Sequence, residues 1–390
     1  MSLNDAPKSE RIHIGFFGKT NAGKSSVINK VTSQNLSIVS DIKGTTTDPV
    51  LKSMELLPIG PVVIIDTPGL DDKTELGIAR IEKTNEILRK TDIAVIVIDA
   101  NDEDEDTINL IKNRNIPYII CYNKCDIKLR KNLKDNEICV SAKTGENIEK
   151  LKELIASKIG NKKNNKKIVS DILNEGDIAL LVIPIDESAP KGRLILPQQQ
   201  TIRDLLDGGN MCICVKDTEL EQAIKTFKDK VKIVITDSQA FKKVAKIVPD
   251  DILLTSFSIL FMRYKGELDG AVKSVKKLDT LSDGDVVLIS EGCSHHRQCN
   301  DIGTVKMPNW IKEYTKKDIK FEFTSGGEFP LDLSKYSLVV HCGGCMLNET
   351  EMKNRISIAN KQNVPITNYG ITIAHINGIL ERSIKPFKNK

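Results

Sequence analysis

The residues GKTNAGKSS at positions 18–26 match the pattern GxxxxGK[ST] of phosphate-binding loops. They lie between an apolar run, IHIGFFG, and an amphipathic run, KSSVINKVTS, and so join a predicted strand to a predicted helix. The glycines would let backbone N–H groups surround the phosphates of a nucleotide. Lys24 would bring a positive charge to the β- and γ-phosphates, and the Ser25 hydroxyl would ligate Mg²⁺. The stretch therefore predicts a nucleoside triphosphate site.

Three later motifs occur in the order of a guanine-nucleotide site. DTPG places Asp66 to hold the magnesium shell and the Gly69 amide to meet the γ-phosphate. NKCD places Asp126 to accept two hydrogen bonds from the N1–H and N2–H₂ edge of guanine, a donor pair that adenine lacks. SAK, residues 141–143, fits the last loop, whose backbone contacts the guanine oxygen. The four motifs together predict binding of GTP rather than ATP.

The stretch KGTTTDPV, residues 43–50, resembles the GTT[RT]D switch of the bacterial tRNA-modification and Era-like GTPases. In that group, an asparagine at the position of Asn21 helps to bind a potassium ion that takes the place of an arginine finger. The resemblance implies that Thr46 ligates Mg²⁺ and that Thr45 lies near K⁺. Leu70 stands where Ras-type GTPases have a glutamine that orients water. We therefore expect slow, magnesium-dependent hydrolysis that potassium stimulates.

The predicted nucleotide site combines all of these motifs. We expect Lys24, Thr46 and Gly69 to be its catalytic residues, with Ser25 and Thr46 as magnesium ligands. The residues predicted to contact GTP or its ions are Gly18, Asn21, Ala22, Gly23, Lys24, Ser25, Ser26, Thr45, Thr46, Asp66, Thr67, Pro68, Gly69, Asn123, Lys124, Asp126, Ser141, Ala142 and Lys143.

A second set of candidate ligands lies far along the chain. VVHCGGCMLNE contains Cys342 and Cys345 with His341 directly in front, and EGCSHHRQCND contains Cys293 and His295. A redox CxxC pair is one interpretation, although such pairs normally stand at a helix start, where the helix dipole lowers a thiol pKa. Three thiolates with one imidazole would equally form a closed tetrahedral zinc site.

An iron–sulfur cluster is the third interpretation, because clusters are held by thiolates, usually four. Here three cysteines fall together and the fourth ligand is open. Residue chemistry alone does not separate zinc from iron–sulfur. The candidates for the fourth ligand are Cys299, Asp301, His295 and His341.

Strand-sized apolar runs alternate with amphipathic runs along the chain, which predicts parallel sheets covered by helices. A polar, basic stretch at 161–167 is typical of a linker. We expect an α/β protein in which a P-loop GTPase domain of the translation-factor-like class, with a parallel-rich sheet, precedes two further α/β domains. The predicted boundaries are 1–162 for the GTP-binding domain, 163–265 for a second α/β domain and 266–390 for the cysteine-bearing domain.

Both cysteine stretches follow predicted strands, DVVLISEG and YSLVV, and open α/β sheets place ligand sites at the carboxyl ends of their strands. A helix should begin just after the second stretch, with Asn348 as its N-cap and Glu351 three residues on. The elements thus bring Cys293, Cys342 and Cys345 towards one edge of a sheet.

Composition narrows the classes of partner. The net charge is +4 and aromatic residues make up 4% of the chain. The composition therefore does not indicate the basic, aromatic-rich surface that is typical of nucleic-acid-binding proteins. The apolar runs are too short to span a membrane. We expect a cytoplasmic protein whose nine cysteines lie in a reducing compartment, which disfavours disulfides. The expected role of Cys121, Cys125, Cys139, Cys212 and Cys214 is packing.

A GTPase that carries CxH near Cys293 and HCxxC at the later stretch resembles the FeFe-hydrogenase H-cluster maturation GTPases, the HydF family. The segment at 186–209 is also similar to that family's dimerisation domain. The resemblance implies a 4Fe–4S cluster on Cys293, Cys342 and Cys345 with an exchangeable fourth ligand. His296 and Cys299 exceed the minimal family pattern, which leaves that ligand open.

The same resemblance implies a homodimer that carries the 2Fe subcluster precursor and delivers it to apo-hydrogenase, with radical-SAM maturases as further partners. GTP hydrolysis would govern these interactions. Two alternatives stay open from the residues. One is an RNA-associated GTPase with a structural zinc site, and the other is a GTP-regulated thiol oxidoreductase that uses Cys342 and Cys345.

Overall fold

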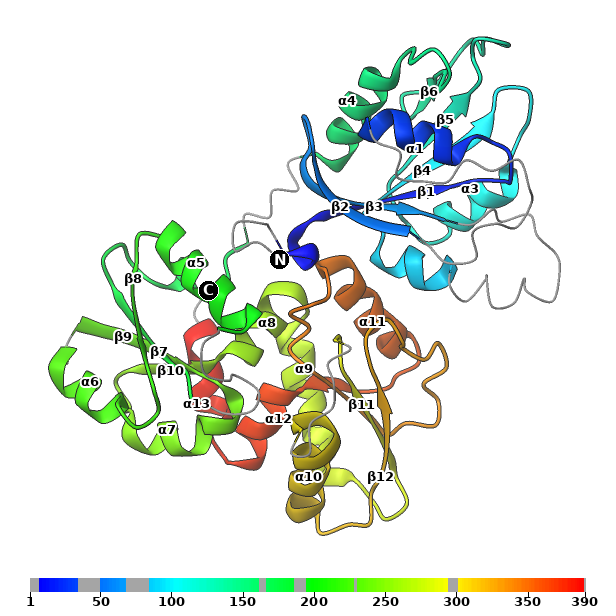
Figure 1. Ribbon diagram of the computed structural model, residues 1–390. Helices are drawn as coiled ribbons and strands as arrows, with labels where there is room; N and C mark the ends of the chain where they lie inside the picture. The colour runs from blue at the N-terminus through cyan, green and yellow to red at the C-terminus, as the bar shows by residue number, and fades with distance from the viewer. Residues whose placement is uncertain are drawn as a thin grey trace. The chain divides into compact units, whose positions relative to one another are not determined.

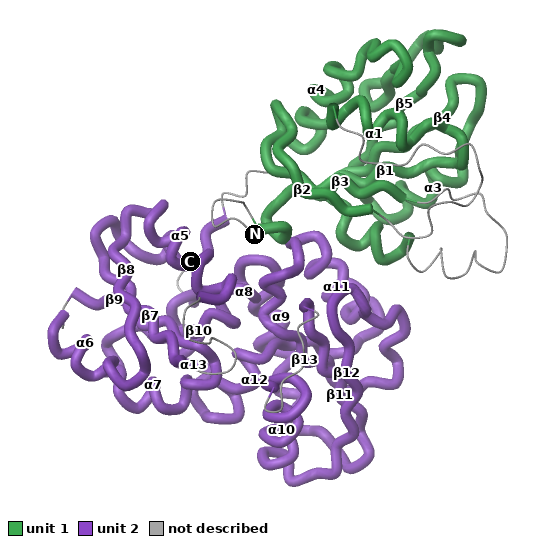
Figure 2. The backbone as a smooth tube through the Cα atoms, viewed as in Figure 1, with its two compact units in different colours: residues 1–164 green, residues 165–390 purple. Residues whose placement is uncertain are grey.

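The chain forms two compact units, residues 1–164 and residues 165–390 (Figure 2). The structure is a computed structural model. It describes residues 7–33, 50–67, 84–160, 166–185, 194–227, 230–293 and 301–388. Within these ranges, no helix is long and apolar enough to cross a membrane.

Within its described residues, unit 1 contains a six-stranded sheet with the order β2-β3-β1-β4-β5-β6 (Figure 1). Its strands are β1 (Ile12–Phe17), β2 (Val50–Leu56), β3 (Gly60–Asp66), β4 (Ile93–Asp99), β5 (Tyr118–Asn123) and β6 (Glu137–Cys139). Neighbouring strands run parallel except for β2, which pairs antiparallel with β3. The helices include α1 (Lys24–Thr32), α3 (Glu105–Lys112) and α4 (Ile148–Ile159).

The central strands of unit 1 are apolar on both faces because helices cover both. Val95 and Val97 of β4 pack with Val27 of α1 and Leu151 of α4. Their neighbours on the same strand face the opposite core, which contains Ile111 of α3. Each core excludes water from one face, which explains why strands such as IAVIVID read as continuous apolar runs.

Unit 2 contains two parallel four-stranded sheets within its described residues. The first has the order β10-β9-β7-β8, from β7 (Ile178–Val182), β8 (Met211–Val215), β9 (Val231–Thr236) and β10 (Leu253–Ser256). The second has the order β12-β11-β13-β14, from β11 (Val286–Ser290), β12 (Lys320–Thr324), β13 (Leu338–His341) and β14 (Ile366–Asn368).

Helices pack on both sheets of unit 2, and one continuous core joins the two. Leu180 and Val234 of the first sheet belong to the same apolar cluster as Leu288 and Val340 of the second. The helices of this unit are α5 (Leu196–Asp207), α6 (Leu220–Phe227), α7 (Phe241–Ile247), α8 (Phe257–Lys265), α9 (Leu268–Ser274), α10 (Met307–Thr315), α11 (Glu349–Lys361), α12 (Tyr369–Ile376) and α13 (Leu380–Ile384).

The architecture agrees with the predicted parallel-rich sheet followed by further α/β structure. The predicted division of residues 163–390 into two domains at residue 265 stays a prediction, because the two sheets lie in one compact unit with a shared core. The helix expected after the second cysteine stretch is α11. The Asn348 side chain caps it by accepting a hydrogen bond from the Glu351 N–H.

Candidate functional site

The predicted phosphate loop connects β1 to α1, and its backbone has positive φ angles that few residue types adopt. Gly18 and Gly23 have φ values of +140° and +85°, and Asn21 has φ 64°. A Cβ atom at Gly18 would lie 2.2 Å from the Val97 carbonyl oxygen, and one at Gly23 would lie 2.2 Å from the Asn123 side-chain nitrogen. Both positions therefore require glycine.

Lys24 and Ser25 occupy the first turn of α1, where phosphate oxygens would meet the helix N-terminus. The Lys24 ammonium group is buried and donates to the Gly18 carbonyl oxygen at 3.3 Å. The Ser25 hydroxyl donates to the Asp66 carboxylate at 3.2 Å. The two residues predicted to arrange Mg²⁺ are thus in contact. Thr67 follows Asp66, and its hydroxyl donates to the Phe16 carbonyl oxygen at 2.6 Å.

Asn123 joins three of the predicted motifs. Its side-chain nitrogen donates to the Ala22 carbonyl oxygen in the phosphate loop at 3.1 Å. Its side-chain oxygen accepts from the Ala142 N–H in the SAK loop at 3.0 Å. Asp126 is exposed, and its carboxylate accepts from the Ser141 hydroxyl at 2.7 Å. The carboxylate expected to read guanine is therefore held by the neighbouring loop.

Sequence reasoning missed Asp99, which ends β4. Its carboxylate accepts a hydrogen bond from the Lys124 ammonium group at 2.7 Å, and this contact lowers the pKa of Asp99. Lys124 also donates to the Asn21 carbonyl oxygen at 3.2 Å, so Asp99 fixes Lys124 against the phosphate loop. The feature of the sequence that could have pointed to Asp99 is its place as an acidic residue at the end of an apolar strand. Asn21, Asp99 and Lys124 line a cleft of about 270 Å³.

Two other predicted residues take no part in the contacts described above. Ser26 is half-buried in the first turn of α1, and Lys143 is the exposed last residue of the SAK loop. Thr45, Thr46, Pro68 and Gly69 lie outside the described residues, so the switch threonines and the γ-phosphate amide stay predictions.

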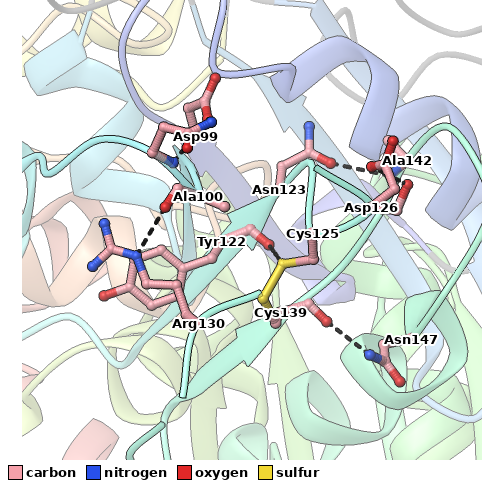
Figure 3. Close-up of a disulfide and its surroundings, with 12 residues drawn as sticks. Asp99, Ala100, Tyr122, Asn123, Cys125, Asp126, Arg130, Cys139, Ala142 and Asn147 are labelled. Atoms are coloured by element: carbon pink, nitrogen blue, oxygen red, sulfur yellow. Dashed lines mark hydrogen bonds between the residues drawn. A yellow bond between two sulfur atoms is a disulfide. The ribbon is translucent and has the colours of Figure 1, made fainter. Parts of the chain in front are cut away.

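The expectation that the cysteines of unit 1 would stay as separate packing residues is wrong for one pair. Cys125, inside NKCD, forms a disulfide with Cys139, which ends β6 (Figure 3). The two residues lie 14 positions apart in the sequence, and no local pattern joins them. Cys121 is a buried free thiol, as expected, and burial raises its pKa to about 12.

Cys212 and Cys214 share one face of β8, and they are less buried than the expected packing role implies. Cys212 is half-buried and Cys214 is exposed, because β8 lies at the edge of its sheet. Their sulfur atoms lie 4.0 Å apart. A hydrogen bond from Cys212 lowers the pKa of the Cys214 thiol to about 7.

The later cysteines lie at adjacent strand ends, as predicted. β11 and β13 are neighbours in which Ser290 pairs with His341, so Cys342 directly follows β13 and Cys293 lies shortly beyond β11. Two backbone N–H groups, those of Gly292 and Gly344, point at the Cys342 sulfur at 3.1 and 3.3 Å. Such donors stabilise a thiolate or a metal-bound sulfur.

His341 has a well-defined structural role beneath this loop. It is fully buried, its Nδ1 donates to the Cys342 carbonyl oxygen at 2.8 Å, and its Nε2 accepts from the Arg355 guanidinium at 3.1 Å. Burial, reinforced by Arg355, lowers the pKa of His341 to about 3, so the ring is neutral. To become a metal ligand, the ring would have to give up one of these contacts. Its predicted ligand role stays a prediction.

Two buried cations lie behind the cysteine loop. Arg355 is fully buried and pairs with the Glu351 carboxylate at 3.0 Å. Lys265, at the end of α8, is 1% exposed and donates to the carbonyl oxygens of Cys345 and Leu347 at 3.2 and 2.9 Å. The sequence did not indicate either contact, because charged residues normally lie at the surface.

Cys293, Cys342 and Cys345 are partly exposed cysteines, and burial raises the pKa of Cys345 to about 12. Their donor chemistry fits a soft metal ion or an iron–sulfur cluster, which would displace the thiol protons. Among the residues that the structure describes, no three histidine, cysteine or acidic side chains gather closely enough to hold a metal ion. His295, His296 and Cys299 lie outside those residues. Asp301 caps the following turn by accepting from the N–H groups of Gly303 and Thr304.

Three family models match the chain in succession. Residues 13–124 match the model described as 50S ribosome-binding GTPase. Residues 168–266 match the hydrogen maturase F dimerization domain, and residues 269–386 match the hydrogen maturase F tetramerization domain. The first match confirms the predicted P-loop GTPase domain and supports GTP with Mg²⁺ as its ligands. The other two support oligomerisation.

Two curated relatives each match less than half of this chain. The tRNA modification GTPase MnmE of Legionella pneumophila (strain Paris) is 34% identical over 158 residues, which are 39% of this chain and 35% of that protein. GTPase Der of Wolinella succinogenes is 33% identical over 195 residues, which are 44% of this chain and 40% of that protein. The match thus spans well under half of these relatives.

Among solved structures, a probable GTP-binding protein, engB, is 23% identical, with a TM-score of 0.31. The match covers 38% of this chain and 98% of that one. Era in complex with MgGDPNP and nucleotides of 16S ribosomal RNA is 19% identical with a TM-score of 0.35. It covers 57% of this chain and 99% of that one.

Proposed function

Because this chain belongs to the hydrogen maturase F family, we propose that it is a GTPase and an iron–sulfur scaffold that acts in the maturation of FeFe-hydrogenase. One observation carries the proposal. Three cysteines follow the adjacent strands β11 and β13 in a chain that also bears a phosphate loop and the loop that we expect to read guanine. We place the protein in the cytoplasm, as its composition predicts.

In unit 1, the chain would bind GTP with Mg²⁺ and hydrolyse it slowly. Lys24 would neutralise charge on the β- and γ-phosphates, and Ser25 and Thr46 would ligate Mg²⁺. Asp66, which contacts the Ser25 hydroxyl, would hold the magnesium shell. Asp126 would accept the guanine edge once it exchanges the Ser141 hydroxyl for the base. Asn21 and Thr45 would contact K⁺, whose charge would take the place of an arginine finger.

In unit 2, Cys293, Cys342 and Cys345 would hold a 4Fe–4S cluster with an exchangeable fourth ligand. The cluster would supply an iron site on which cargo can be anchored. Buried side chains on the interior side would support that site. His341 would stay neutral, Arg355 would donate to it, and Lys265 would donate to a carbonyl oxygen of the cysteine loop. The cargo would be the 2Fe subcluster precursor, delivered by a homodimer to apo-hydrogenase. Radical-SAM maturases would be further partners, and GTP hydrolysis would govern the interactions with all of these partners.

The hydrolysis part is tested by measuring phosphate release in potassium and in sodium buffers at fixed Mg²⁺. We expect roughly tenfold faster turnover in potassium, because a bound cation stabilises charge that develops on the γ-phosphate. Asn21→Ala should remove most of that difference while the requirement for Mg²⁺ persists. Equal turnover in the two salts would contradict the potassium site and leave GTP hydrolysis standing.

The cluster part is tested by anaerobic reconstitution with iron and sulfide, followed by metal analysis and EPR of the reduced protein. Wild type should bind iron and sulfide in equal amounts and give a 4Fe–4S signal, and serine variants of Cys293, Cys342 and Cys345 should lose it. Cys212→Ser is the control that should keep it. Zinc without iron in all samples would overturn the scaffold proposal in favour of a structural zinc site.

The fourth ligand is addressed by the same spectra. Variants at His295, His341 and Cys299 should bind the cluster, and the one that replaces a ligand should alter the g-values of the signal. If Cys299→Ser abolished the cluster, Cys299 would close the site and an exchangeable ligand would be excluded.

A further inference from the structure

The disulfide between Cys125 and Cys139 lies within the guanine-reading part of unit 1, and nothing in the proposed GTP cycle uses it. Cys125 stands between Lys124 and Asp126, at the variable position of NKCD. Cys139 ends β6, two residues before Ser141 of the SAK loop. The bond therefore joins the two loops that are expected to recognise the base.

Hydrogen bonds already align these two loops (Figure 3). The Cys125 N–H donates to the Val140 carbonyl oxygen at 3.0 Å. The Ser141 hydroxyl donates to Asp126 at 2.7 Å. The Cys139 carbonyl oxygen accepts from the Asn147 side chain at 2.9 Å, which ties the strand end to the start of α4. The disulfide thus adds a covalent connection between two loops that hydrogen bonds already hold together.

We propose that Cys125 and Cys139 form an oxidative modification site that reacts with low-molecular-weight disulfides, and that its oxidation state sets how fast guanine nucleotide leaves the site. The inference rests on the proposed binding of GTP. It differs from the cluster chemistry of unit 2 in its residues, its location and its readout.

The exchange is chemically balanced. The thiolate of Cys125, which is partly exposed, attacks a small disulfide R–S–S–R, forms a mixed disulfide and releases one thiolate RS⁻. Cys139, which is 5% exposed, then attacks the Cys125 sulfur and releases the second RS⁻. Two protein thiols are oxidised to one disulfide, the small disulfide is reduced to two thiols, and the two protein protons pass to these products.

The structure also offers a hydrogen-bond acceptor to the reduced Cys125 thiol. The Cys125 sulfur lies 3.2 Å from the Tyr122 carbonyl oxygen, so a reduced thiol would have an acceptor in place. Oxidation replaces that hydrogen bond with a covalent bond to the neighbouring loop. Because the base must leave between Asp126 and the SAK loop, a bond that keeps these loops together should slow its departure more than its entry.

The test compares nucleotide release from the full-length chain in two redox states. The protein is loaded with a fluorescent GDP analogue, treated either with a phosphine reductant or with a small disulfide such as oxidised glutathione, and chased with unlabelled GDP. Release from the oxidised wild type should be roughly fivefold slower, as expected from ordering one or two loop side chains in advance. Peptide mapping after alkylation should find the Cys125–Cys139 link in the oxidised sample alone.

Three variants complete the design. Cys125→Ser and Cys139→Ser should release the nucleotide at the reduced rate in both buffers. Cys121→Ala, which removes a buried thiol of the neighbouring strand β5, should respond to oxidation as the wild type does. Equal release rates from oxidised and reduced wild type, or a redox response that survives in Cys125→Ser, would overturn the modification site. Absence of guanine-nucleotide binding in both states would instead overturn the GTP proposal, and the present inference with it.

Discussion

The nucleotide site of unit 1 and the cysteine site of unit 2 both lie at the carboxyl ends of parallel strands, but different interactions hold their loops. In unit 1, uncharged side chains join loop to loop through hydrogen bonds, as in the contact of the buried Ser141 hydroxyl with the exposed Asp126 carboxylate. In unit 2, Arg355 and Lys265, both buried, support the cysteine loop from behind. Loops that must open for a ligand keep exchangeable contacts, whereas a loop that presents thiols is fixed from the protein interior.

The strongest test of this difference is Arg355→Met. The guanidinium is fully buried and pairs with Glu351, so its removal takes a hydrogen-bond donor away from that carboxylate, from the Gly326 carbonyl oxygen and from His341. We expect a loss of about 3–5 kcal/mol in the free energy of unfolding of unit 2. Urea unfolding followed by fluorescence of Trp310, the one tryptophan in the sequence, measures unit 2 selectively.

Lys353→Met is the matched control for Arg355→Met. Lys353 lies on the same helix and pairs with Glu349 at 2.7 Å, but its side chain is 57% exposed. Its loss should change stability by no more than about 0.5 kcal/mol. If the two variants were equally stable, buried charge would not support the cysteine loop and the contrast between the two sites would fail.

In the nucleotide site, Asp126→Asn should have the largest effect. The substitution removes a carboxylate that can accept two hydrogen bonds from guanine, and the affinity for GTP should fall by about 100-fold. Xanthine has a carbonyl where guanine has an amino group, so the Asp126→Asn variant should gain affinity for XTP. Fluorescence titration with both nucleotides measures this.

The control for Asp126→Asn is Asp135→Asn, which changes an exposed carboxylate elsewhere in unit 1. It should leave both affinities unchanged, and the midpoint of unfolding should stay the same for both variants. A general loss of binding to GTP and XTP alike would mean that Asp126 holds the loop rather than reads the base.

The two sites also differ in how far the sequence predicted them. The phosphate loop was predictable because its chemistry requires glycine at Gly18 and Gly23 and because its motif lies between a strand and a helix. The strand-end placement of Cys342 followed from periodicity. The supports were not predictable, since Arg355 and Lys265 read as ordinary helix-surface charges. The Cys125–Cys139 bond was hidden because it depends on pairing of β5 with β6.

Lys265→Met should have an intermediate effect. The substitution keeps the length of the side chain and its apolar packing but removes the ammonium group, so the carbonyl oxygens of Cys345 and Leu347 lose a buried donor. We expect a loss of about 1–3 kcal/mol in the stability of unit 2. The reconstituted variant should release iron to a chelator faster than the wild type. Unchanged stability with unchanged iron release would show that the loop is held without the lysine.

The smallest expected effect is at Asn348, which begins α11 directly after the cysteine loop. Its side-chain oxygen accepts from the Glu351 N–H at 3.0 Å, so Asn348→Ala removes one N-cap and should cost about 1 kcal/mol in the urea experiment. Asn348→Asp should retain the stability, because aspartate caps equally well and its charge favours the helix N-terminus. If Asn348→Asp were as destabilised as Asn348→Ala, loss of the cap hydrogen bond would not explain the destabilisation.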